Sequence, residues 1–252
     1  MTGTTTIPPP AGEGTRGGPY ARHLESIHAS VPAERFHEGF EAWYGGLLPA
    51  DRAAPILDLG CGRGQLLRYL ALRGHTSAEG FDVISEFARG IRESTGFPVH
   101  VGDDPRAFLA GRAGSFELIT LLDVLEHIPV PEIIPLLESV RRALRAGGRV
   151  IVSGPHAASL TGLYTRYLDL THTTCFTLTS LRYALESAGF EGVVSLEPRI
   201  RLGLRPGRWG LLLAQKLVSL AMGLLYRVEA PGDPSNPPHF HRRIAVAAGA
   251  PR

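Results

Sequence analysis

The sequence predicts an α/β fold in the form of a doubly wound, mostly parallel, seven-stranded sheet with helices on both faces. Short apolar segments alternate with segments of helical periodicity between residues 55 and 153, and this repeat is typical of parallel strands joined by crossover helices. An aspartate follows four of the apolar segments, and ligands of such sheets bind beyond the carboxyl ends of the strands. The sequence therefore predicts one ligand site that collects Asp58, Asp82, Asp103 and Asp123.

One domain accounts for the length, because 252 residues suffice for one full hydrophobic core, and we assign it to residues 20–252. Residues 1–19 are rich in Thr, Pro and Gly and lack the apolar run of a signal peptide, so they are predicted to form a disordered tail. Cys61 and Cys175 make neither a disulfide framework nor a zinc pattern, which fits a cytoplasmic location. A formal net charge of +2 gives no reason to expect nucleic acid as a partner.

The centre of the predicted site is a glycine-rich turn after the first strand, residues 55–59. Gly60, Gly62 and Gly64 alternate there, and a helix begins at once with Gln65. Glycine is needed in such a turn because a Cβ would forbid its dihedral angles or keep a ligand away from the backbone. The dinucleotide fingerprint G-x-G-x-x-G would place the third glycine one residue later. The turn is therefore predicted to bind a nucleotide-like ligand of another kind.

Residues 55–67 resemble motif I of the class I methyltransferases that depend on S-adenosylmethionine (SAM), usually written as a strand followed by D/E-x-G-x-G-x-G. The resemblance extends over residues 56–190 and implies a Rossmann-like methyltransferase sheet, SAM as the cofactor and a SAM-binding core at residues 55–153. Asp58, before the first glycine, could face the cationic amino group of this cofactor. The cofactor-binding residues predicted in this way are Asp58, Gly60, Cys61, Gly62, Gly64, Asp82, Val83, Asp103, Asp104, Leu122 and Asp123.

Two of these aspartates receive specific roles. Asp82 ends the second predicted strand twenty residues after Gly62, which is the distance at which a βαβ unit brings a carboxylate to ribose hydroxyls. It could instead cap the helix that follows at residues 85–94. The resemblance implies that Asp103, after the third strand, accepts a hydrogen bond from the adenine amino group, with Asp104 in second place. Either residue could also be an ordinary turn former.

The other elements surround this core. Residues 20–50 carry apolar and aromatic residues at helical spacing, broken by Pro32, and predict two leading helices. The resemblance implies that these helices cover the cofactor, and packing on the sheet is the alternative. The remaining elements are a fourth strand at 116–122, a helix at 131–144, a fifth strand ending at Ser153, and two last strands at 192–196 and 243–248.

Residues 154–178 form a longer connection than is usual between a strand and a helix, and such insertions at the ligand end are usually functional. We interpret this segment as the substrate loop, with Tyr164, Tyr167 and Asp169 as substrate contacts. Its D-x-T-H run at 169–172 resembles a methyltransferase subgroup that is often found with polysaccharide and glycosylated natural-product pathways. The resemblance implies a small-molecule acceptor, which could be glycosylated or lipid-linked.

A second insertion, residues 197–242, contains an almost wholly apolar stretch at 209–226. This stretch is about long enough to cross a bilayer, but Lys216 lies at mid-span and two glycines interrupt it. The main interpretation is a helix that packs on the domain or on the mate in a homodimer. An interfacial helix that touches a lipid-linked substrate is the alternative. Stable membrane insertion is not expected.

The chemistry of SAM points to histidine as the catalytic group. Methyl transfer from SAM is an in-line displacement at a carbon that the sulfonium already activates, so the protein mainly positions and desolvates the reactants. A hydroxyl acceptor must also lose a proton, and histidine is the natural base at neutral pH. The candidate bases are His127 and His172, followed by His156, although His127 could instead pack beside Pro129.

We therefore expect an O-methyltransferase for a sugar or another hydroxylated small molecule in specialised or polysaccharide metabolism. N- or C-methylation is the alternative within the same fold. A SAM-binding regulator without catalytic activity is the alternative from another class, since the fold does not name the acceptor.

A metal site is the alternative to a purely organic mechanism. Asp123, Glu126 and His127 resemble the acid-x-x-Glu-His set with which some methyltransferases of small RNA ends and of quinone precursors hold a divalent cation. His172 or His156 could supply a further ligand. The first acid is Asp here rather than Glu, and ligand type alone does not fix a metal. The prediction is therefore SAM without a metal, with the divalent cation as the less favoured interpretation.

Overall fold

The computed structural model describes residues 18, 21–22, 26, 32–198, 206–229, 231–232 and 242–251. The predicted tail and the first leading helix lie outside the described residues, apart from the isolated positions before residue 32. The second leading helix is α2 (Ala33–Trp43), and Pro32 stands at its N-cap, where the sequence predicted a break.

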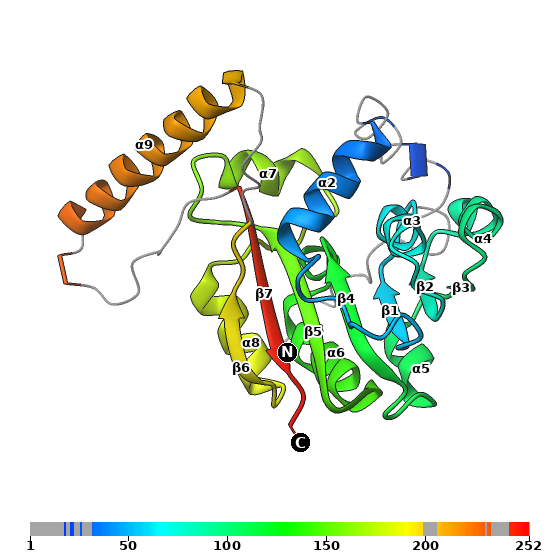
Figure 1. The fold of residues 1–252 in the computed structure, drawn as a ribbon. Helices are drawn as coiled ribbons and strands as arrows, with labels where there is room; N and C mark the ends of the chain where they lie inside the picture. Colours follow the sequence, from blue (N-terminus) through cyan, green and yellow to red (C-terminus); the bar gives the residue numbers. More distant parts are fainter. Residues whose placement is uncertain are drawn as a thin grey trace, which may run out of the picture.

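Seven strands form one sheet in the order β3-β2-β1-β4-β5-β7-β6 (Figure 1). Neighbouring strands pair in parallel except at β7, which runs antiparallel to both β5 and β6. The predicted doubly wound, mostly parallel sheet is therefore confirmed, with one reversed strand. The strands are β1 (Ile56–Leu59), β2 (Ala78–Asp82), β3 (Val99–Val101), β4 (Phe116–Leu122), β5 (Leu144–Pro155), β6 (Glu191–Ser195) and β7 (Arg243–Gly249).

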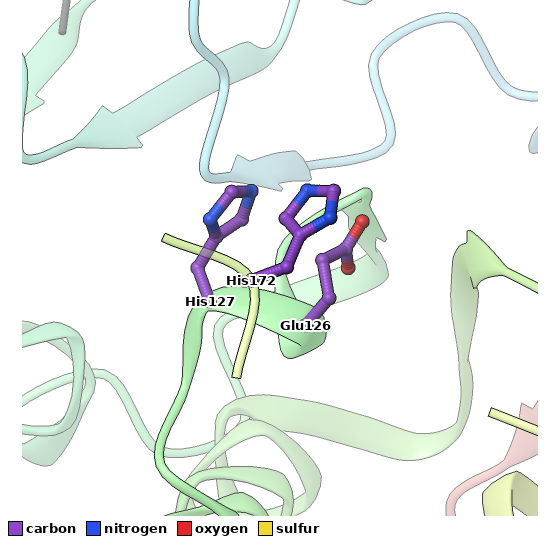
Figure 2. A group of neighbouring side chains, drawn as sticks. All are labelled: Glu126, His127 and His172. Carbon is purple, nitrogen blue, oxygen red and sulfur yellow. The ribbon is translucent and has the colours of Figure 1, made fainter. Parts of the chain in front are cut away.

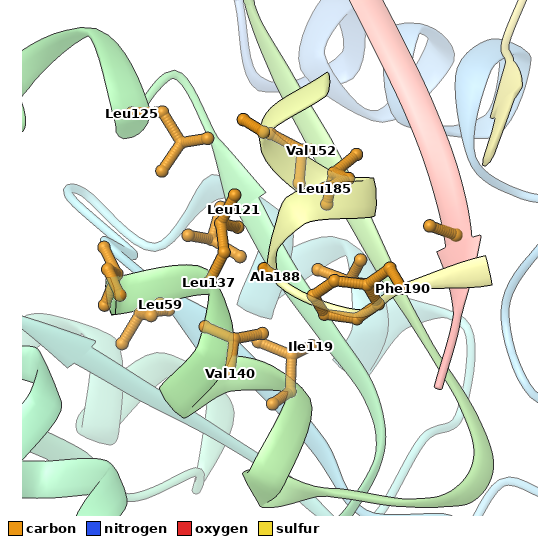
Figure 3. Packing of buried hydrophobic residues seen from close by; sticks show 14 of the residues in the cluster. Leu59, Ile119, Leu121, Leu125, Leu137, Val140, Val152, Leu185, Ala188 and Phe190 are labelled. Carbon is orange, nitrogen blue, oxygen red and sulfur yellow. The ribbon is translucent and has the colours of Figure 1, made fainter. Parts of the chain in front are cut away.

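Helices bury both faces of the sheet. One face is covered by α5 (Pro105–Ala110), α6 (Val130–Ala143) and α8 (Leu178–Ser187), and the other by α2, α3 (Gln65–Leu72) and α4 (Ala88–Thr95). Neighbouring residues of a strand point to opposite faces, so Leu57 belongs to the first cluster and Ile56 to the second. Figure 3 shows the first cluster, in which Leu137 and Val140 of α6 and Leu185 of α8 meet the strands. The two clusters hold the strand ends that build the site.

Short helices lie near the ends of the parallel strands. The 3₁₀ helices η1 (Ser85–Phe87) and η2 (Leu125–His127) follow β2 and β4 closely. The predicted substrate loop contains a helix that the sequence did not predict, α7 (Gly162–Leu168). Figure 1 shows α7 and α9 (Pro206–Glu229) on the side of the molecule where the parallel strands end.

The apolar helix α9 presents a stripe of large side chains to solvent. These side chains recur three or four residues apart, which places them along one face of the helix. The stripe consists of Leu213, Leu217, Leu220, Leu224 and Val228, all exposed. The expectation that α9 packs on the domain is therefore wrong for this face. Within the described residues, every helix is too short or too polar to span a membrane.

Candidate functional site

The glycine turn adopts the conformation that its sequence requires. Gly60, Gly62 and Gly64 have φ angles of 80°, 49° and 74°, which lie in the left-handed region that favours glycine. A Cβ on Gly60 would lie 2.4 Å from Cγ2 of Val124, and one on Gly64 would lie 2.6 Å from Cγ1 of Ile91. A Cβ on Gly62 would meet nothing within 4 Å. Close packing therefore adds to the backbone requirement at the first and third glycine.

Asp82 connects the glycine turn to the segment after β2. Its carboxylate is buried and accepts the backbone N–H of Gly62 at 2.6 Å and that of Ile84 at 2.9 Å. Burial raises the pKa of Asp82, and these two amides, together with that of Val83, oppose the increase. Neither η1 nor α4 has a side-chain cap, so the alternative role of Asp82 as a helix cap is wrong. Each carboxylate oxygen has a second lone pair, so a hydrogen bond to ribose stays a prediction.

Asp58 lies in the core directly behind the turn. Its carboxylate is buried and accepts a hydrogen bond of 2.8 Å from Thr120 Oγ1 of β4. Burial raises the pKa of Asp58 to about 7, and the charge of Asp82 adds to the increase. Cys61 is also buried, and a Cβ on Gly80 would lie 2.8 Å from its sulfur. The Cys61 side chain therefore packs the turn against β2, and burial raises the pKa of its thiol.

The aspartates after the third and fourth strands are engaged within the protein. Asp104 caps α5, because its Oδ1 accepts the backbone N–H of Arg106 at 2.8 Å, whereas Asp103 is exposed beside it. Asp123 has a φ of 59° and is the one non-glycine residue with a positive φ in the described part of the chain. Its carboxylate forms an ion pair with Arg243 of β7. The capping role explains Asp104, whereas adenine recognition by Asp103 and cofactor binding by Asp123 remain predictions. Val83 and Leu122 are half-buried nearby.

Glu126 and His127 of η2 meet His172 of the substrate loop (Figure 2). One ligand atom from each of the three side chains lies within 4.8 Å of the others, and the two imidazole rings are 4.7 Å apart at 66°. Glu126 is 1% exposed, and its Oε2 accepts no hydrogen bond. Burial raises the pKa of Glu126 well above its usual value, and the charge of Asp123 adds to this. The structure therefore groups the two favoured histidines with a buried carboxyl group.

Hydrogen bonds assign the tautomers of both histidines. His172 Nδ1 lies 3.1 Å from the carbonyl oxygen of Thr165, which can only accept, so this nitrogen carries the proton. His127 Nδ1 lies 2.8 Å from Thr171 Oγ1, whose own proton is donated to Asp169 at 2.7 Å, so His127 Nδ1 also donates. Each neutral imidazole therefore has its lone pair on Nε2.

The remaining predicted residues have different surroundings. Asp169 is 5% exposed and accepts two hydrogen bonds from Thr171, so it positions His127 through Thr171, and substrate contact by Asp169 stays a prediction. Burial alone would raise the pKa of Asp169, but these hydrogen bonds and the nearby histidines hold it below its usual value. His156 is fully buried and does not belong to the group of Glu126, His127 and His172. Tyr164 and Tyr167 are exposed on α7, where substrate contact stays a prediction.

Two contributions were absent from the sequence reasoning. Arg243 contacts Asp123 from a strand 120 residues further along the chain, and no local sequence pattern predicts such a pair. Thr171, in contrast, stands two residues after Asp169, and this spacing is typical of a local side-chain to backbone hydrogen bond. The D-x-T-H run thus contained a detectable signal for the residue that orients His127.

A family model for a methyltransferase domain matches residues 34–196, which is more than half of the chain. The fold and this match define a methyltransferase of the Rossmann-like kind. The chain belongs to the class I SAM-dependent methyltransferases, and SAM is its cofactor.

Comparisons with individual proteins agree with this family. Two curated proteins named ubiquinone biosynthesis O-methyltransferase, from Pseudomonas aeruginosa PAO1 and Dechloromonas aromatica, are 31% and 33% identical over 103 residues. The match covers 39% of this chain and 43% of each relative, so the chain spans less than half the length of these relatives.

Solved structures share the fold. A SAM-dependent methyltransferase from Archaeoglobus fulgidus has a TM-score of 0.65 at 18% identity, covering 91% of this chain and 99% of that one. Phosphoethanolamine N-methyltransferase 2 from Haemonchus contortus, in complex with SAM, has a TM-score of 0.58 at 15% identity, covering 92% and 57%. At these identities the likeness shows the fold alone.

Proposed function

We propose that this methyltransferase transfers the methyl group of SAM to a hydroxyl group of a small molecule. The observation that supports this is the group of Glu126, His127 and His172, because a hydroxyl acceptor needs a group that takes up its proton. In the reaction, the O–CH₃ bond forms as the S–CH₃ bond breaks. The products are a methyl ether and S-adenosylhomocysteine, and the proton passes to an imidazole Nε2 and then to solvent.

Two further observations favour oxygen over nitrogen or carbon as the acceptor atom. The curated relatives are named as O-methyltransferases. Hydrogen bonds at Nδ1 prepare both histidines to accept a proton at Nε2. A neutral amine can attack the methyl group with its own lone pair, so it needs such a base less than a hydroxyl does. A sugar or another hydroxylated metabolite of specialised or polysaccharide biosynthesis is the proposed acceptor, since the D-x-T-H run supports that subgroup. A cytoplasmic location belongs to the same proposal.

The test separates cofactor binding from chemistry. The purified protein is incubated with SAM and a panel of sugars and phenols, and methylated products and S-adenosylhomocysteine are measured by mass spectrometry. Asp82→Ala should weaken SAM binding by about 1 to 3 kcal/mol, because it removes a hydrogen-bond partner of a buried site. His127→Asn and His172→Asn should leave SAM affinity unchanged and lower the turnover by about 10² to 10⁴.

The control is His100→Asn, because His100 likewise lies beside a glutamate, 2.6 Å from Glu79, but it belongs to β3 and not to the group of Glu126, His127 and His172. This variant should behave like the wild type. Methylation that appears only on nitrogen, or full turnover by the double histidine variant, would contradict the proposed role of the histidines. SAM binding without any product would support the regulator instead.

A further inference from the structure

We propose that Glu126, His127 and His172 hold a divalent transition-metal cation, and that an open coordination position of this cation receives the acceptor oxygen. This inference deepens the proposed function at the same site. Its decisive test measures the binding of metal alone, so it does not depend on methyl transfer.

The arrangement of donor atoms is the first argument. Two imidazole nitrogens and one carboxylate oxygen lie within 4.8 Å of one another. Ligand atoms around one zinc ion lie about 2 Å from the metal and therefore about 3 to 4 Å from each other. Small side-chain rotations would bring these three atoms to that spacing, since all three side chains point to the same side of η2 (Figure 2). Three protein ligands with an open position are typical of catalytic metal sites.

The buried carboxyl group of Glu126 is the second, independent argument. It is 1% exposed, and Oε2 has no hydrogen-bond partner, although buried polar groups of proteins are generally hydrogen-bonded. Gly154 of β5 lies beside it, because a Cβ there would be 3.3 Å from Oε2. The charged groups that act on the carboxyl group of Glu126 include Asp123, Asp169 and Arg243, of which two are negative and one positive. A cation would both satisfy Oε2 and balance this charge.

The fixed tautomers are the third argument. A metal-bound histidine usually donates its other ring N–H to a carboxylate, a carbonyl or water, which orients the ring. Both histidines do so here, His172 toward the Thr165 carbonyl and His127 toward Thr171, which in turn is hydrogen-bonded to Asp169. In both rings these hydrogen bonds at Nδ1 leave Nε2 as the nitrogen that can bind a metal.

The structure also explains which residues belong to the set. Of the ligands suggested by sequence, Glu126, His127 and the further ligand His172 come together. Asp123 does not join them, because its carboxylate forms an ion pair with Arg243. Imidazole ligands favour later transition metals such as Zn²⁺ and Co²⁺ over Mg²⁺ and Ca²⁺. Such a cation would act as a Lewis acid and lower the pKa of a hydroxyl bound to it. With the cation bound, the imidazoles would serve as ligands and the proton would pass directly to solvent, whereas without it an imidazole Nε2 accepts the proton as in the proposed function.

The experiment uses the untagged, chelator-treated full chain, titrated with Zn²⁺, Co²⁺ or Mg²⁺ in a calorimeter, with visible absorption as a second readout for Co²⁺. Wild type should bind one Zn²⁺ or Co²⁺ and bind Mg²⁺ far more weakly. Glu126→Gln and His172→Asn should weaken Zn²⁺ binding by at least about 100-fold, and Thr171→Val by about 10-fold. His100→Asn, the matched histidine of a Glu–His pair, should bind like the wild type.

A wild type that binds Zn²⁺ no more tightly than Glu126→Gln does would overturn the inference. If the variants fail to fold by circular dichroism, the visible absorption of wild type with Co²⁺ decides the question, because a spectrum identical to that of free Co²⁺ excludes the site. Hydroxyl methylation by a chelator-treated protein that binds no metal would refute the cation and leave the proposed function intact. Metal binding without hydroxyl methylation would do the reverse.

Discussion

The two halves of the ligand end are stabilised by different means. In the cofactor half, the backbone sets the geometry: glycines with positive φ form the turn, and Asp82 accepts two backbone amides. In the proposed acceptor half, side chains contribute more to the geometry. Thr173 of the substrate loop donates to the carbonyl oxygen of Ile128 at 2.7 Å and thereby holds the loop against η2. The difference indicates that the SAM site tolerates little change, whereas the acceptor site can vary by substitution of single side chains.

The largest expected effect comes from the backbone-defined half. Gly60→Ala should lower the free energy of unfolding by about 2 to 5 kcal/mol, because it adds left-handed strain and a contact 2.4 Å from Val124. Gly62→Ala is the matched control in the same turn, since its Cβ meets nothing within 4 Å. It should cost only about 1 kcal/mol, from backbone strain alone. Urea unfolding without SAM measures both. Equal losses for the two variants would show that close packing at Gly60 is unimportant.

A smaller effect, with a defined pH window, is expected at Asp58. Its pKa is raised from 3.8 to about 7 in the folded protein, so folding favours the protonated form. Its contribution to stability is therefore fully present below about pH 4 and is lost as the pH rises to about 7. Asn cannot ionise, so Asp58→Asn should match the wild type at pH 4 and be more stable by about 2 to 4 kcal/mol at pH 8.

Urea unfolding of the SAM-free protein at several pH values from 4 to 8 checks the prediction for Asp58. Thr120→Val is the companion variant, because Thr120 Oγ1 donates to Asp58 and lowers its pKa. Without this hydrogen bond, the free energy of unfolding should differ more between pH 4 and pH 8 than it does in the wild type. Parallel stability curves for wild type and Asp58→Asn would mean that the pKa of Asp58 is ordinary.

Sequence reasoning was most successful where the signal is local. The glycine turn requires positive φ at Gly60, Gly62 and Gly64, and the structure has it at all three. The break at Pro32 and the strand that ends at Asp82 are also confirmed. In such places a few neighbouring residues determine the conformation, so the sequence alone predicts it.

The sequence was insufficient where contacts between distant residues decide the surroundings of a side chain. Cofactor binding by Asp123 stays a prediction, but the sequence did not indicate that its carboxylate forms an ion pair with Arg243 of β7. Asp169 was predicted to contact the substrate, which stays untested, and the sequence did not indicate that Asp169 is buried and linked to His127 through Thr171. Which side chains pair between two elements depends on the order of the strands and on the course of the loops. Local periodicity predicts neither of these.

The smallest effect is expected on the outer face of α9, where side chains contribute little to the domain. Leu217 and Leu224 are 58% and 63% exposed, so the double substitution to Ala should change the free energy of unfolding by less than about 0.5 kcal/mol. Leu137→Ala in the core, where the side chain is 0% exposed, should instead cost about 2 to 5 kcal/mol. A loss above about 1 kcal/mol for the α9 variant, growing with protein concentration, would mean that a second copy of the chain buries this stripe in solution. A loss of that size that is independent of concentration would mean that α9 packs on its own domain, because only contacts within one chain stabilise it equally at every dilution.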